Sequence, residues 1–164
     1  MLRAANTLVD EYEVISEFDD AVERPVDLDD AADSVATQKS SDALEEFGHR
    51  WKMYRDGVGE PPLKDGASPT YLRLRHISET EKMCIFEKGQ EEGGLMMLAA
   101  RFALVGARNL ELPNGKPFEV KFEFIRHGGS RFRVASRESL DVFPSKVQLE
   151  IGNVAVQRLS LRPS

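Results

Sequence analysis

The sequence has little cysteine, little histidine and no long hydrophobic run. One cysteine, Cys84, excludes an intramolecular disulfide, and three scattered histidines leave too few soft ligands for a structural zinc site. No stretch of about 18 apolar residues is present, and acidic residues follow closely on Met1, so we expect neither a membrane span nor a signal peptide. These absences favour a protein that stays in the cytoplasm where it is made.

The common catalytic and phosphate-binding motifs are also missing. There is no phosphate loop, GxGxxG, HExxH, nucleophile elbow or EF-hand pattern. Cys84 has apolar neighbours, which favours a buried small side chain over a nucleophile. His76 and His127 have no carboxylate at a defined spacing, and acid-base catalysis by either is the least favoured alternative. We therefore expect a protein that is not an enzyme, with no catalytic residue, metal or cofactor.

What the sequence does contain is typical of one soluble globular domain. The chain has 164 residues, 41% of them hydrophobic and 30% charged. A chain of this length buries roughly two-thirds of the surface that its unfolded form exposes, and this composition supports a packed core.

Charge is distributed unevenly along the chain. Residues 1–48 hold 14 acidic and 3 basic side chains, whereas residues 49–164 hold 14 acidic and 19 basic ones. Residues 1–40 lack the pattern of an independent core and are interpreted as an extended acidic arm. The arm is either a solvated tail or a segment that docks on another surface. For docking, the expected anchors and partner-binding residues are Tyr12, Ile15, Phe18, Val26 and Leu28.

An amphipathic helix is predicted for residues 41–56. Leu44, Phe47, Trp51 and Tyr54 recur at helical intervals, and Ser41 or Asp42 is expected to cap the first turn. Trp51 and Tyr54 are candidate partner contacts, although packing inside the protein's own core is favoured. Breakers throughout residues 57–69 indicate a linker before a core domain at residues 70–164.

The first half of this core domain is predicted to form a strand and two helices. Residues 71–75 alternate in polarity as a half-buried strand does. Ser78 and Glu81 form a capping box that begins a helix ending near Gly89, with Met83, Phe86 and the neighbouring Ile85 on its apolar side. Residues 95–105 are apolar on almost every face and predict the central core helix.

A β-hairpin is predicted to follow. Asn114-Gly115 is typical of a tight reversal with positive φ at both positions. Residues 118–124 alternate strictly, so their four apolar side chains are expected to face the core. A three-residue loop at 127–129 would then place Phe124 opposite Phe132 and Glu123 opposite Arg133.

The C-terminal segment has two readings of nearly equal weight. Val147, Leu149 and Ile151 alternate as in a strand, and Gly152-Asn153 is a plausible turn to a second strand. The intervals from Leu140 through Val154 instead fit one face of a helix, with Pro144 in its first turn.

Several arginines indicate a basic face on the predicted hairpin and on strand 71–75. The candidate nucleic-acid-binding residues are Arg126, Arg131, Arg133 and Arg137. Interleaved glutamates, including Glu119 and Glu123, weaken this reading, and a solvated or partner-facing sheet is favoured over nucleic-acid binding.

The order of four short segments resembles small tailed-phage morphogenesis proteins of the tail-assembly-chaperone type. The segments are Pro69 to Ile77, a helical pair containing Met97 to Ala100 and Leu104-Val105, Asn114 to Phe118, and Glu138 to Pro144 running into Glu150 to Asn153. The resemblance implies a non-catalytic protein that binds other virion or assembly proteins. It also implies a helix over residues 144–158.

Taken together, these observations predict an α+β protein with a small helical and antiparallel-sheet body and an extended acidic N-terminal arm. The expected function is a non-enzymatic phage virion assembly or structural protein. It would act in the host cytoplasm, as a transient factor or a virion component, form oligomers, and bind other phage proteins through its arm and sheet surface. The alternative is a nucleic-acid-associated regulator whose acidic arm masks the basic hairpin. Neither reading includes a membrane or a small-molecule substrate.

Overall fold

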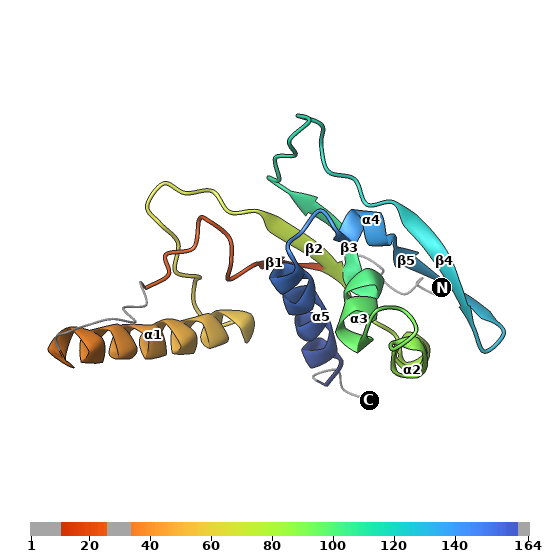
Figure 1. The fold of residues 1–164 in the computed structure, drawn as a ribbon, viewed down its shortest axis with the longest axis horizontal. Helices are drawn as coiled ribbons and strands as arrows, with labels where there is room; N and C mark the ends of the chain where they lie inside the picture. The colour runs from red at the N-terminus through yellow and green to blue at the C-terminus, as the bar shows by residue number, and fades with distance from the viewer. Residues whose placement is uncertain (1–10, 26–33, 161–164) are drawn as a thin grey trace, which may run out of the picture. The chain divides into compact units, whose positions relative to one another are not determined.

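The computed structural model describes residues 11–25 and 34–160 and has an α+β fold (Figure 1). Within these ranges there are five helices and two small antiparallel sheets. The chain divides into two compact units. One combines the residues up to Ser16 with those from Thr70 onward, and the other is Glu17–Pro69. None of the described helices is long and apolar enough to cross a membrane.

The first unit contains a three-stranded antiparallel sheet in the order β1-β2-β3. Its strands are β1 (Glu11–Ile15), β2 (Tyr71–Arg75) and β3 (Leu104–Arg108). The predicted strand at 71–75 is confirmed: Leu72 and Leu74 are buried, while Arg73 between them is exposed. Alternate side chains of a strand point to opposite faces, and here one face lies on the core.

β1 changes the expected boundary of the acidic arm. Residues 11–15 are an edge strand of the core sheet, with Val14 opposite Leu72 and Ile15 opposite Tyr71. Val14 and Ile15 are both buried. The segment is too short to show a core pattern of its own, and its ladder partner lies far away in the sequence. Sequence periodicity therefore could not assign it to the sheet.

Helices α3 (Leu95–Ala103) and α5 (Ser145–Ser160) pack together at the centre of the first unit. All residues from Leu98 to Ala103 are buried, which confirms α3 as the core helix. The helical reading of residues 144–158 is also confirmed by α5. The predicted end of α3 at Val105 is wrong, because the chain turns extended at Leu104 and pairs with β2 as β3.

Helix α2 (Glu79–Lys88) begins with the predicted capping box. The Glu81 amide donates to Ser78 Oγ at 3.2 Å, and the Ser78 amide donates to Glu81 Oε1 at 2.9 Å. The predicted apolar side is wrong for two residues: Met83 and Phe86 are 57% and 53% exposed, whereas Cys84 and Ile85 are buried. Only Ile85 of the expected set faces the core.

Glu81 couples the stability of this unit to pH. Burial raises the pKa of Glu81, but hydrogen bonds from the Arg75 guanidinium and from Ser78 outweigh it, so the pKa lies below its ordinary value of 4.5. A carboxyl with a lowered folded-state pKa contributes stability that is complete above the unfolded value and is lost as the pH falls through the folded value. As the pH falls below the ordinary value of 4.5, Glu81→Gln should therefore lose less stability than the parent protein does. Urea-unfolding midpoints measured as a function of pH test this prediction.

Glu79→Gln, an exposed change in the same turn, is the control, and its midpoint should fall with pH as steeply as that of the parent. Equal dependence of the midpoint on pH for Glu81→Gln and the parent would contradict the prediction.

The second sheet is a hairpin of β4 (Phe122–His127) and β5 (Ser130–Ala135). The predicted register is wrong by one residue: the turn is Gly128-Gly129, so Phe124 lies opposite Arg133 and Ile125 opposite Phe132. Both glycines have positive φ, which suits a two-residue turn. A slip of one residue moves every side chain to the other face.

Two further details of this region differ from expectation. Residues 118–121 are not in a strand. At the reversal before them, Gly115 has positive φ but Asn114 does not, and the Gly115 amide donates to the Leu112 carbonyl. Short helix α4 (Arg137–Leu140) follows β5 and begins at Ser136, whose hydroxyl accepts from the Ser139 amide.

The second unit is built on α1 (Ser34–Arg55), which confirms the predicted helix but extends it by two turns at its start. Ser41 and Asp42 lie inside the helix and are not its cap. Capping residues are tolerated inside helices, and no glycine or proline interrupts residues 34–41. Residues 57–69 have no helix, and a single bridge joins Val22 to Leu63.

Candidate functional site

The register of the β4-β5 hairpin sorts its side chains onto two faces. We call the outer face the set Phe122, Phe124, Arg126, Arg131 and Arg133. All three arginines are exposed, Phe124 is 53% exposed and Phe122 is half-buried. Phe122 and Phe124 were expected in the core, and the one-residue slip is what places them here.

Arginine and phenylalanine alternate in contact along the outer face. The guanidinium carbon of Arg131 lies 4.1 Å from the ring centroid of Phe124, and that of Arg133 lies 3.7 Å from the centroid of Phe122. Each contact joins diagonal neighbours on the two strands. A guanidinium over an aromatic ring is favourable and leaves its N–H groups available for an anion.

The opposite face of the hairpin, here called the inner face, includes Glu123, His127 and Phe132 and contacts the rest of the first unit. Glu123 pairs with the buried Arg101, and Phe132 packs edge-on against Phe102 with ring centroids 5.9 Å apart. His127 contacts the Glu87 carboxylate of α2. Glu123 therefore does not offset the charge of the outer face, contrary to the interleaving expected from the sequence.

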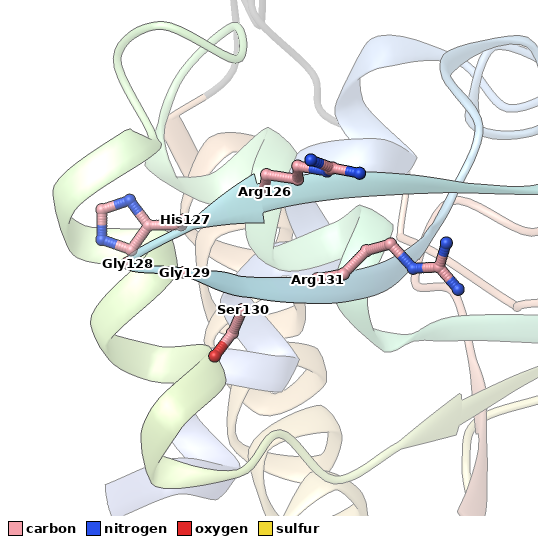
Figure 2. Close-up of a pocket in the computed structure, with 6 residues that line it drawn as sticks. All are labelled: Arg126, His127, Gly128, Gly129, Ser130 and Arg131. Atoms are coloured by element: carbon pink, nitrogen blue, oxygen red, sulfur yellow. The ribbon is translucent and has the colours of Figure 1, made fainter.

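The turn of the hairpin borders an open surface pocket of about 590 Å³. Its lining residues are Arg126, His127, Gly128, Gly129, Ser130 and Arg131. Figure 2 shows the Arg126 and Arg131 guanidinium groups extending along the hairpin, away from the His127 ring. The two guanidinium groups are available at one end of the outer face.

A second exposed feature is the apolar surface of α2 formed by Met83 and Phe86, here called the α2 patch. The two side chains are one turn apart and therefore neighbours on the helix surface. Both are more than half exposed. The helix is held in place from its other side, where Cys84 and Ile85 are fully buried.

The remaining basic candidates lie elsewhere. Arg137 is on α4 with its guanidinium 3.9 Å from Glu92, and Arg75 forms two hydrogen bonds to Glu81. Arg75 is therefore engaged within the fold. Arg137 is 58% exposed but does not share the hairpin ladder.

The arm anchors predicted from the sequence are largely used inside the fold. Ile15 is 2% exposed and is not available to a partner. Tyr12 lies between His76, at 4.9 Å between ring centroids, and the Arg158 guanidinium at 4.1 Å. Phe18 is half-buried, with Arg24 5.5 Å from its ring centroid. Val26 and Leu28 lie outside the described residues.

The aromatic stripe of α1 packs on itself. The Trp51 ring lies 6.0 Å from Phe47 and 5.3 Å from Tyr54, centroid to centroid. Trp51 is 7% exposed and is thus a packing residue, while Tyr54 is half-buried. The favoured reading, packing inside the protein, is the one that these contacts support.

Among the residues that the structure describes, no group of three or more histidine, cysteine or acidic side chains is placed to hold a metal ion. His127 does have a carboxylate neighbour, Glu87, which the sequence analysis missed because 40 residues separate them. His76 packs against the Tyr12 ring.

Cys84 is buried as expected, and burial raises the pKa of its thiol. We expect this thiol to react with a disulfide reagent about a hundredfold more slowly in the folded protein than in urea, since reaction requires both access and the thiolate. A Cys84→Ser, Met83→Cys double variant moves the thiol one residue to the exposed surface and should react at the rate of the unfolded chain. Rapid native-state reaction of Cys84 would contradict its burial.

Searches of protein-family models, characterised proteins and solved structures found no match to this chain.

Proposed function

We propose that the protein is a non-enzymatic phage virion assembly protein that binds other virion proteins through exposed surfaces of its α+β body. The observation that carries the proposal is the α2 patch. Met83 and Phe86 expose 57% and 53% of their surface on a helix that packs on the core through Cys84 and Ile85. Neither residue is needed to complete the core.

Adjacent exposed methionine and phenylalanine side chains suit a protein partner. Single exposed apolar residues are ordinary, but neighbouring ones form a patch that water solvates poorly. Methionine and aromatic residues are enriched in protein interfaces, and methionine adapts its shape to different surfaces. Flanking charges such as Glu87, which is 51% exposed, supply a polar rim.

The assignment to phage assembly rests on the resemblance to tail-assembly-chaperone-type proteins. The helix α5 over residues 145–160 is what that resemblance implies for this segment, and it supports the proposal. The site of action would be the host cytoplasm, with oligomers forming among the assembly proteins. Mass spectrometry of purified particles separates a permanent virion component from a transient factor.

Burial removes two of the expected partner contacts, one in the arm and one in α1. Ile15 and Trp51 are buried, so they cannot present their side chains to a partner without local unfolding. The α2 patch takes their place as the principal partner contact in the proposal.

A double variant, Met83→Lys with Phe86→Lys, tests this function in a phage genome that encodes the chain. We expect the yield of infectious particles to fall at least tenfold, the effect of losing an interface hot spot. The matched control is Leu149→Lys, which changes a side chain 50% exposed on α5. Circular dichroism should show both variants folded. An unchanged yield from the folded double variant would overturn the proposal.

A further inference from the structure

We propose that the outer face of the β4-β5 hairpin is a binding site for single-stranded nucleic acid. This site is separate from the α2 patch and goes beyond the protein-binding function proposed above. Three properties of the outer face identify the class of ligand: its positive charge, its two arginines directly opposite each other, and its accessible aromatic rings, of which Phe124 is exposed and Phe122 is half-buried.

The arginines of the outer face, Arg126, Arg131 and Arg133, form no ion pair with another described residue. The acidic residue of the same strand, Glu123, points to the inner face and pairs with Arg101. A ligand carrying several negative charges would complement this surface.

Arg126 and Arg131 are direct cross-strand partners. Like charges directly opposite each other on a ladder destabilise the pairing. Both residues line the pocket at the turn, and their guanidinium groups extend along the hairpin away from that turn (Figure 2). The repulsion between the two like charges is relieved when phosphate groups bind along this edge of the outer face.

The rings distinguish nucleic acid from other polyanions. Phe124 is 53% exposed, and Arg131 and Arg133 lie over Phe124 and Phe122. Bases stack on phenylalanine rings and on guanidinium planes, while the arginine N–H groups bind the backbone phosphates. Base faces are accessible in a single strand but are covered in a duplex. A two-stranded ribbon with alternating rings and cations therefore favours a single strand.

Fluorescence anisotropy with the full-length chain tests the site. The probes are oligo-dT and oligo-U of about 15 nucleotides, a length within the usual footprint of such sites. If three arginines contact phosphates, the logarithm of the association constant should fall against the logarithm of salt concentration with a slope of about −2. Comparison of the two probes shows whether DNA or RNA is preferred.

Two variants separate the contributions of charge and stacking. Arg131→Gln with Arg133→Gln should reduce the salt slope to about −0.7, because one arginine remains. Phe124→Ala should weaken binding about tenfold with little change of slope, as expected for loss of a stacking ring. The matched control, Arg73→Gln with Lys116→Gln, removes the same charge from exposed positions elsewhere and should bind as the parent does.

Three outcomes would overturn the inference. One is no measurable binding to either oligonucleotide. Another is binding that the hairpin variants do not alter. The third is equal binding of polyglutamate and oligo-dT with no effect of Phe124→Ala, which would show a surface for acidic polypeptides. None of these outcomes bears on the protein-binding function proposed for the α2 patch, because the Met83 and Phe86 variants test that surface separately.

Discussion

Replacing Arg101 by methionine is expected to lower the free energy of unfolding by about 3 kcal/mol. Arg101 is 2% exposed in the centre of the first unit. Its Nε donates to the Ala135 carbonyl at 2.9 Å and its Nη1 donates to Glu92 at 3.0 Å. Its Nη2 donates to Glu123. One side chain therefore links α3, the hairpin and the loop after α2.

The size of this effect follows from what methionine leaves behind. The Ala135 carbonyl loses its donor in a buried place, and two carboxylates lose their counter-charge. Glu92 and Glu123 are 24% and 49% exposed, so water solvates them in part and the loss lies at the low end for breaking a buried pair. Urea unfolding, monitored by circular dichroism, measures this loss of stability.

The exposed Arg73→Met is the control for Arg101→Met and should change stability by less than about 0.5 kcal/mol. Arg101→Lys should recover only part of the loss, because a single ammonium cannot reproduce three directed bonds of a guanidinium. Stability equal to the parent for Arg101→Met would contradict the account of the core.

Gly152→Ala should destabilise the protein by about 3 kcal/mol, the upper end of the range for overpacking. A Cβ at position 152 would lie 2.1 Å from the Met96 carbonyl oxygen and 2.8 Å from the Met96 carbonyl carbon. Both are backbone atoms of α3, so neither moves without displacing the helix. The close approach of α3 and α5 thus requires glycine at this position.

Gly48→Ala is the matched substitution in α1. A Cβ there meets nothing within 4 Å. It should raise helix stability by about 0.5–1 kcal/mol. The fluorescence of Trp51, the single tryptophan, follows the unit that contains α1, while circular dichroism follows both units. An unchanged free energy of unfolding for Gly152→Ala would show that α3 and α5 do not pack this closely.

The parts of the fold that local sequence specifies could be predicted. The capping box of Ser78 and Glu81, the alternation at residues 71–75 and the apolar run of α3 each depend on neighbours within a few residues. β1 and β3 could not be predicted, because a short strand is stabilised by a distant ladder partner. For β1, that partner is β2, more than 50 residues away.

The candidate site was predicted in part. Arg126, Arg131 and Arg133 were identified, but Phe122 and Phe124 were assigned to the core because a three-residue turn was assumed. Gly128-Gly129 carries the signal for a two-residue turn with positive φ, and this turn places Phe124 exposed and Phe122 half-buried on the outer face. Met83 and Phe86 were predicted to be buried because they are apolar. Helix α2 instead packs through Cys84 and Ile85, since the tertiary structure decides which side of the helix is covered.

The most direct test of the proposed function is light scattering during size-exclusion chromatography of the full-length chain mixed with the virion proteins of a phage whose genome encodes this chain. We predict co-elution at the mass of a complex, lost in the Met83→Lys, Phe86→Lys double variant and kept in Leu149→Lys. A chain that elutes alone as a monomer in every mixture, or a complex that the double variant forms equally well, would contradict the claim that this protein works by presenting the α2 patch to a partner.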